Sequence, residues 1–174
     1  LNAGFGSHAL GSLTTGNNNT AIGCEAGDTT TTGNNIIAIG RQARASAADA
    51  NNEITLGNSS ISSLRCQTQT ISALSDERDK TNIVDSEEGL DLINALRPRK
   101  FTWAMREESS NNGKTELGFI AQELDAALGD KNDYVHAVSK TNPDRLEASY
   151  GRLIPILVKA VQDLSGKVSA LEAA

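Results

Sequence analysis

Aromatic side chains, proline and cysteine are all scarce in this chain of 174 residues. Aromatics make up 3% of the sequence, and none of the three prolines precedes Pro98. A rich aromatic core is therefore excluded, although 38% apolar residues still allow a modest core. Cys24 and Cys66 form no CxxC pair, so we expect two free thiols rather than a disulfide framework or a metal site.

Positive charge is also in short supply, because the formal net charge is -6. That balance argues against a nucleic-acid partner and gives no basic patch for an anionic membrane surface. No apolar run approaches the ~18 residues that a membrane span needs. His8 and His136 lack acidic or cysteine neighbours at ligand spacing, so we expect no metal, and no cofactor is indicated. The chain begins at Leu1, and we expect a fragment of a longer protein.

The composition changes sharply near residue 75. Residues 1–74 contain no lysine and carry a net charge of -1, whereas residues 75–174 carry -5. Phe5 is the one aromatic residue of the first part. We therefore predict two domains, 1–74 and 75–174, of which the first cannot build an ordinary globular core.

The first part is a repeat with a period of 17 residues. Glycine marks the period at Gly6, Gly23, Gly40 and Gly57. An apolar residue precedes each glycine, at Phe5, Ile22, Ile39 and Leu56. A fixed period with glycine and asparagine between short apolar segments is typical of stacked β-structure.

One large apolar side chain per unit cannot bury itself within a single chain, so the units need neighbours along the chain or around an axis. The alternative is a disordered Asn/Thr/Gly linker, which the regular period disfavours. Residues 58–74 indicate one or two strands or an extended connection.

The second part has a mixed α+β pattern. Glu87–Leu96 and Ala121–Leu128 favour helices, and Gly129 is a plausible C-cap of the second. Strands are predicted by the patterns at 99–103, 114–120 and 134–138, with a turn at 111–113.

The last helix begins near Leu153 and has apolar residues at heptad spacing. They are Ile154, Leu157, Val161, Leu164, Val168 and Leu171. This seam predicts a coiled coil, and the alternative is a helix that packs on its own domain. In parallel coiled coils, β-branched residues at heptad position a with leucine at position d favour dimers. This preference conflicts with the trimer that the resemblance described below implies.

Ser75-Asp76-Glu77-Arg78-Asp79-Lys80-Thr81-Asn82-Ile83 opens the second part and carries its chemistry. A serine hydroxyl needs a base to become a nucleophile, and a lysine amine serves once desolvation disfavours its ammonium form. Five residues across a bend bring Lys80 within reach of Ser75. Without further support, a serine in such a charged string reads as a solvated or helix-capping residue.

Four ordered blocks resemble the intramolecular chaperone auto-processing domains, the S74 peptidase family. The opening string is similar to the family motif Ser-Asp-x-Arg-x-Lys-x-Asn-Ile, although Asp79 stands where an apolar residue is usual. The other blocks are Ala95–Trp103 (ALRPRKFTW), Gly118–Glu123 (GFIAQE) and Tyr150–Leu153 (YGRL). The resemblance covers essentially all of 75–174.

The resemblance implies a domain that trimerises the stalk before it and then cleaves itself off. Carried over, the cleavage site is the Leu74–Ser75 bond, Ser75 is the nucleophile and Lys80 is the general base. The repeat resembles the β-roll heads of trimeric adhesins and the β-helical stalks of phage fibres. That resemblance implies an assembly of three chains. The expected fold is thus a trimeric β-helix or β-roll stalk followed by an α+β chaperone domain that ends in a coiled-coil-like helix.

The expected setting is a phage tail fibre, tailspike or neck appendage in the virion. Its chaperone part would fold in the host cytoplasm and leave after assembly. The expected partner is the chain itself as a homotrimer, and a host-surface receptor for the parent fibre is unknown. Two alternatives stay open: a structural trimerisation cap that never cuts, and a receptor-binding fibre tip.

Overall fold

The computed structural model describes every residue of the chain except 69 and 108. The chain forms two compact units. The first comprises Leu1–Ser63, Phe101–Glu116 and Lys140–Leu146. The second comprises Leu64–Lys100, Leu117–Ser139 and Glu147–Ala174. The predicted boundary between residues 74 and 75 falls inside the second unit and stays a prediction.

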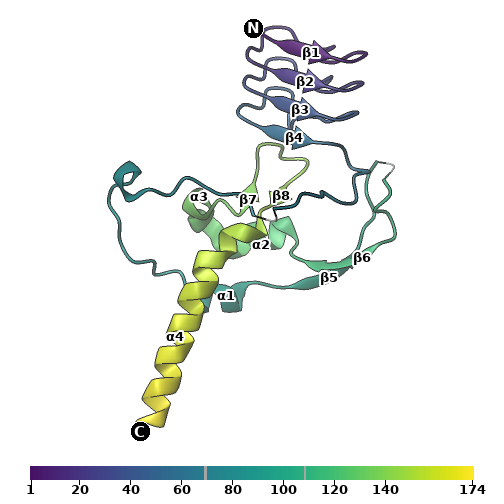
Figure 1. Cartoon of the computed structure of the whole chain (residues 1–174). Coiled ribbons are helices and arrows are strands. Elements are labelled where there is room, and N and C mark those ends of the chain that lie inside the picture. The colour runs from purple at the N-terminus through teal and green to yellow at the C-terminus, as the bar shows by residue number, and fades with distance from the viewer. Residues whose placement is uncertain (69, 108) are drawn as a thin grey trace. The chain divides into compact units, whose positions relative to one another are not determined.

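Four short parallel strands build the first unit, which we call the stack (Figure 1). They are β1 (Ala3–Phe5), β2 (Thr20–Ile22), β3 (Ile37–Ile39) and β4 (Ile54–Leu56). Each residue pairs with the residue 17 positions later, as Ala21 does with Ala38. The sequence period is thus the length of one coil, so that equivalent residues form columns along the stack.

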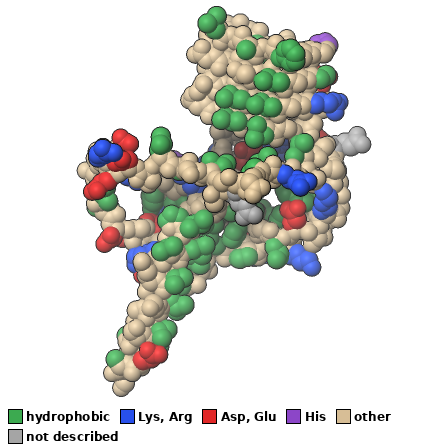
Figure 2. Space-filling view, in the orientation of Figure 1, with side chains coloured by type: hydrophobic (Ala, Val, Ile, Leu, Met, Phe, Trp, Pro, Cys, Tyr) green, Lys and Arg blue, Asp and Glu red, His purple; other side chains and the backbone are tan. Residues whose placement is uncertain are grey.

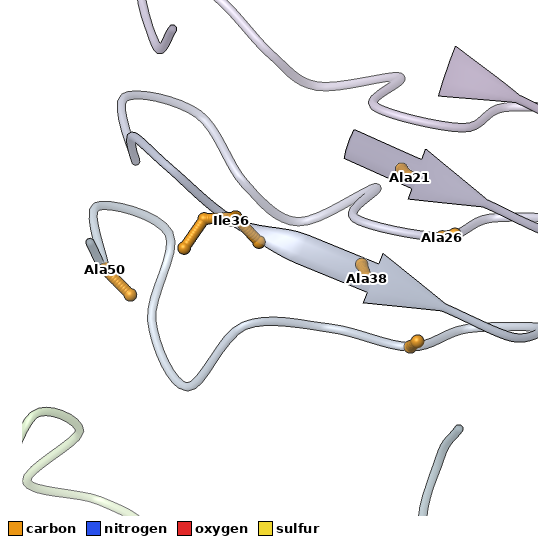
Figure 3. Close-up of a cluster of buried hydrophobic side chains, with 6 residues drawn as sticks. Ala21, Ala26, Ile36, Ala38 and Ala50 are labelled. Carbon is orange, nitrogen blue, oxygen red and sulfur yellow. The ribbon is translucent and has the colours of Figure 1, made fainter. Parts of the chain in front are cut away.

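Small side chains fill the interior of the stack. Figure 3 shows the cluster, which consists of Ala21, Ala26, Ile36, Ala38, Ala43 and Ala50. All six are at most 3% exposed. A single chain therefore buries a core of alanines and Ile36, which was not predicted from the sequence.

Asparagine side chains join one coil to the next. The buried Asn19 donates from Nδ2 to the Gly33 carbonyl (2.8 Å) and accepts from the Ile36 amide (2.9 Å). At the adjoining corner, Asn18 and Asn35 adopt left-handed backbone angles, with φ of 61° and 56°. Asparagine tolerates that conformation better than most residues, which explains its recurrence in the repeat.

The large apolar residues of the repeat lie on the outside and form an apolar column. Its members are Phe5, Ile22, Ile39 and Leu56, with exposures of 78%, 45%, 41% and 53%. Figure 2 shows hydrophobic side chains exposed over the stack. The prediction that one chain leaves these side chains uncovered is confirmed, whereas the three-chain arrangement stays a prediction.

Two segments from the second half of the sequence belong to the first unit. Ser109 donates to the Ser59 carbonyl (2.7 Å), and Asn142 donates to the Ser46 carbonyl (2.8 Å). An ion pair between Arg145 and Glu107 (2.7 Å) joins the two segments to each other. Residues that follow Ser75 therefore bind the last coils of the stack directly.

The second unit contains most of the helices (Figure 1). They are α1 (Leu90–Ala95), α2 (Ala121–Leu128), α3 (Asn132–Val135) and α4 (Ile154–Glu172). The strands β5 (Arg99–Thr102) and β6 (Thr115–Gly118) pair, as do the antiparallel β7 (Val138–Ser139) and β8 (Glu147–Ala148). The predicted helices, the strands at 99–103 and 114–120 and the Gly129 cap, with φ of 55°, are confirmed.

The predicted strand at 134–138 is wrong for most of its length. Residues up to Val135 belong to α3, and His136 ends that helix with a left-handed φ of 53°. The buried Asn132 explains the difference, because its side chain donates to the Val138 carbonyl (2.8 Å) and accepts from the Val138 amide (2.9 Å). Those two bonds close a compact turn where apolar alternation alone suggested an extended chain.

Helix α4 packs on its own unit along one face and leaves the other uncovered. Ile156 and Ala160 are buried, and α1 packs against this helix. The residues of the predicted heptad seam are between 45% and 77% exposed. The alternative, a helix that packs on its own domain, is thus confirmed for one face, whereas the coiled coil along the exposed seam stays a prediction. None of the described helices is long and apolar enough to cross a bilayer.

Residues 58–74 connect the stack to the motif. Apart from residue 69, which is not described, they contain neither helix nor strand. Of the two predictions for this segment, the extended connection is the one that agrees with the structure.

We predict that Gly33→Ala destabilises the stack. A β-carbon at this position would lie 2.4 Å from the Ala50 carbonyl oxygen, so the two coils would have to move apart. The expected loss is about 1–3 kcal/mol of unfolding free energy, measured by urea denaturation. Gly151→Ala is the control, because nothing lies within 4 Å of its new methyl group. Equal stability of the two variants would contradict the close stacking.

We predict that Asp163 makes the second unit sensitive to acid. A hydrogen bond from Lys159, and then one from the Leu90 amide (3.2 Å), lower the pKa of Asp163 below its ordinary 3.8. A lowered folded-state pKa stabilises the fold fully above pH 3.8, and that contribution is lost as the pH falls through the lowered value.

Urea midpoints measured from neutral to strongly acid pH check this. Asp163→Asn should lose stability at neutral pH and flatten the profile below pH 3.8. Asp91→Asn on α1, where the carboxylate is exposed, is the control for the removal of one negative charge. A wild-type slope retained by Asp163→Asn would refute the assignment.

Candidate functional site

The motif that opens the predicted second domain folds into a tight turn. Asp76 precedes a short 3-10 helix, η1 (Glu77–Asp79), and Lys80 follows it in extended conformation. Backbone bonds from Asp79 to the Asp76 carbonyl (3.2 Å) and from Lys80 to the Glu77 carbonyl (3.0 Å) close the turn. The chain therefore reverses between Ser75 and Lys80.

The turn brings the two predicted site residues together. Lys80 Nζ lies 2.6 Å from Ser75 Oγ and 3.1 Å from the Ser75 carbonyl oxygen. Both distances are within hydrogen-bond range, which is the geometry that proton transfer between a hydroxyl and an amine requires. The Ser75 hydroxyl belongs to the residue that follows the Leu74 carbonyl, so nucleophile and target are neighbours on one backbone.

A second pair within the turn was assigned no role from the sequence. The Asp76 carboxylate accepts from the Arg78 amide (2.9 Å) and from the Arg78 guanidinium at Nε (3.0 Å) and Nη2 (2.6 Å). The guanidinium bonds, together with the amide bond, lower the pKa of Asp76. The same pairing raises the pKa of Arg78. The sequence signal for this pair was an aspartate at a cap position two residues before an arginine.

The site is open to solvent in a single chain. Leu74 is fully exposed, and every residue of the turn is exposed as well. Water stabilises an ammonium group, and an ammonium donates to a hydroxyl rather than taking its proton. The Ser75–Lys80 contact is therefore exposed to water in a single chain.

Three of the four family-like sequence blocks contact one another within the second unit. Arg99, from the second block, binds Glu123, from the third, through Nη2 (2.5 Å) and Nε (2.8 Å). This pairing lowers the pKa of Glu123. The Phe119 amide, from the third block, donates to Tyr150 Oη (2.9 Å), from the fourth, and the two rings lie edge to face with centroids 5.3 Å apart. The third block is thus joined to both the second and the fourth.

Metal binding finds no support among the residues that the structure describes, which contain no group of three or more histidine, cysteine or acidic side chains placed to hold an ion. His8 Nδ1 lies 2.9 Å from the hydroxyl of its neighbour Ser7. His136 caps α3, as described above. Cys24 and Cys66 are exposed free thiols.

Comparisons with known proteins identify the region that starts at the motif serine. One curated relative is the uncharacterized protein VP1 of Micromonas pusilla reovirus (isolate Netherlands/2005), 45% identical over 60 residues. That match spans 33% of this chain but only 3% of the viral protein. No solved structure matches the chain. Residues 75–132 match the model of the peptidase S74 family, described as chaperone of endosialidase, and this match supports a chaperone domain in that stretch.

Proposed function

We propose that residues 75–174 form an intramolecular chaperone that assembles three copies of a fibre protein and then cuts itself off at the Leu74–Ser75 bond. The observation that carries this proposal is the 2.6 Å approach of Lys80 Nζ to Ser75 Oγ at the first residue of the family match. Peptidase S74 domains are self-cleaving serine peptidases at the family level, and this contact supplies a nucleophile and a base in the expected place.

The chemistry needs no cofactor. A neutral Lys80 amine takes the proton of the Ser75 hydroxyl, and Oγ attacks the Leu74 carbonyl carbon. The bond between that carbon and the Ser75 nitrogen then breaks, and the nitrogen takes the proton back from Lys80. The resulting ester is hydrolysed by water to a Leu74 carboxylate and a free Ser75 hydroxyl. Each chain reacts once, and the shared backbone supplies the proximity that a separate substrate would have to gain by binding.

Assembly would switch this chemistry on. The apolar column of the stack and the seam of α4 are both exposed in one chain, and extended apolar surfaces of this kind mark interaction sites. The chaperone family suggests trimer formation, and neighbouring subunits that enclose the turn would exclude water from Lys80. Desolvation disfavours the ammonium form, so the amine would become a base only after the chains have come together.

The chaperone role has its own support in the contacts to the stack. Phe101–Glu116 and Lys140–Leu146 follow the cleavage site in sequence yet belong to the stack unit. They bind carbonyl oxygens of Ser46 and Ser59 in the last coils. Segments placed in this way can hold the final coils in register while the repeat forms. After the cut, only such non-covalent contacts would remain, so the domain could leave.

The parent protein is best placed in a virion. A viral relative and the endosialidase chaperone family both favour a phage-associated protein. We accordingly infer a tail fibre, tailspike or appendage, with the chaperone part folded in the host cytoplasm and released after assembly. A permanent cap that never cuts is the competing function, and the experiment below decides between the two.

We predict that the freshly made wild-type chain separates on a denaturing gel into fragments 1–74 and 75–174, identified by mass. Ser75→Ala removes the nucleophile and should leave the chain whole. Lys80→Met keeps the length of the side chain without its amine and should also prevent cutting. Thr81→Ala, next to the site, is the control and should cut normally. An intact wild-type chain in a proven trimer would support the permanent cap instead.

We further predict that assembly and cutting fail together. Ile39→Asp places a carboxylate in the apolar column and should slow both trimerisation, followed by light scattering, and cleavage. Thr15→Asp places the same charge at an exposed polar position of the stack and should change neither rate. Rapid cutting in a chain shown to be monomeric would contradict the dependence on assembly.

A further inference from the structure

We propose that Asp76 and Arg78 are positioning residues for self-cleavage, fixing the turn that holds Lys80 against Ser75. This inference rests on the proposed function and adds to it two residues that touch neither the scissile bond nor the reacting atoms. It follows from the local geometry of Ser75–Lys80 alone.

The distance between the reacting groups requires a turn. Residues five positions apart in an extended chain are separated by roughly 16 Å, given about 3.3 Å per residue. Lys80 Nζ nevertheless lies 2.6 Å from Ser75 Oγ. The single helical turn η1 therefore shortens the separation between these two residues, which the long lysine side chain could not span alone.

Asp76 is the residue that starts this turn. Its backbone is extended, with φ of -68° and ψ of 135°, and its carboxylate accepts from the Arg78 amide at the helix start (2.9 Å). A side-chain acceptor at this position satisfies an amide that would otherwise lack an intrahelical partner. A helix of one turn has few internal bonds of its own, so the cap contributes a large share of what defines it.

Arg78 also binds the same carboxylate through its side chain. Its guanidinium forms a forked pair with Asp76 through Nε and Nη2. A planar fork fixes direction as well as distance, which a lysine cannot reproduce. One carboxylate thus binds both the backbone amide and the guanidinium of Arg78. These hydrogen bonds lie within the segment 75–80.

The pair also prevents the Asp76 carboxylate from binding the Lys80 amine. Asp76 lies four residues before Lys80 in a tight turn, and a free carboxylate beside an amine favours its charged form. Arg78 occupies both oxygens of Asp76, while the bonds of Lys80 go to Ser75. Arg78 therefore leaves the amine available to the hydroxyl rather than to its acidic neighbour.

The test compares the first-order cleavage rate of the full wild-type chain with the rates of its variants. Asp76→Ala removes both the cap and the clamp, and we expect the rate to fall about 100-fold, the scale associated with misplaced reacting groups. Asp76→Asn keeps an oxygen for the cap, so its rate should fall less. Arg78→Ala should cut at a rate similar to that of Asp76→Asn. The double variant Asp76→Asn/Arg78→Ala should cut little more slowly than either, because both changes remove the same Asp76–Arg78 interaction. Glu77→Ala in the same turn is the control.

Two measurements, of trimer formation and of the thermal midpoint, separate positioning from a structural defect. Both should match wild type in every variant. Arg78→Lys should restore only part of the cleavage rate lost in Arg78→Ala. If Asp76→Ala and Arg78→Ala cut at the wild-type rate while Ser75→Ala does not cut, the positioning role is wrong and the proposed function stands. If the wild-type trimer does not cut, both are wrong. Should Asp76→Ala fail to assemble, Asp76→Asn and Arg78→Ala decide the question.

Discussion

Each coil of the stack depends on the coil beside it. A unit of 17 residues buries little more than alanine, and residues such as Asn19 find their hydrogen-bond partners one coil away. Such a coil has almost no stability of its own, so the repeat gains stability only as neighbouring coils are added. The last strand of the stack, β4, lies at the edge of its sheet, and the segments around Ser109 and Asn142 bind the coils at this end.

Under the proposed mechanism, the chemistry of the motif turn also depends on neighbours, in this case on other chains. Ser75 and Lys80 are in contact in a single chain, yet both are exposed to water. Under the proposed mechanism, packing between chains would change the solvation of the amine without needing to move it. Folding and cutting would then be coupled through one physical quantity, the access of water to Lys80, rather than through a large conformational change.

Sequence patterns predicted those features that depend on local spacing. The 17-residue glycine period predicted the coils, the heptad apolar residues predicted α4, and the Ser75/Lys80 spacing predicted a contact across a bend. Long-range features were missed for physical reasons. The alanine core cannot be read from hydrophobicity, since alanine is common outside cores, and the turn after α3 depends on one buried amide, Asn132. The Asp76–Arg78 pair was not predicted, because the charged string around it is equally typical of a solvated turn.

The bonds from Ser109 and Asn142 to the stack end on main-chain oxygens, which every residue type possesses. Their formation requires a coil of the right shape and no particular side chain at the positions contacted. Natural variation in the exposed residues of the last coils would therefore leave this docking intact. If the proposed function holds, the parent fibre could diversify its outer face during evolution while the segments that bind the stack stay unchanged.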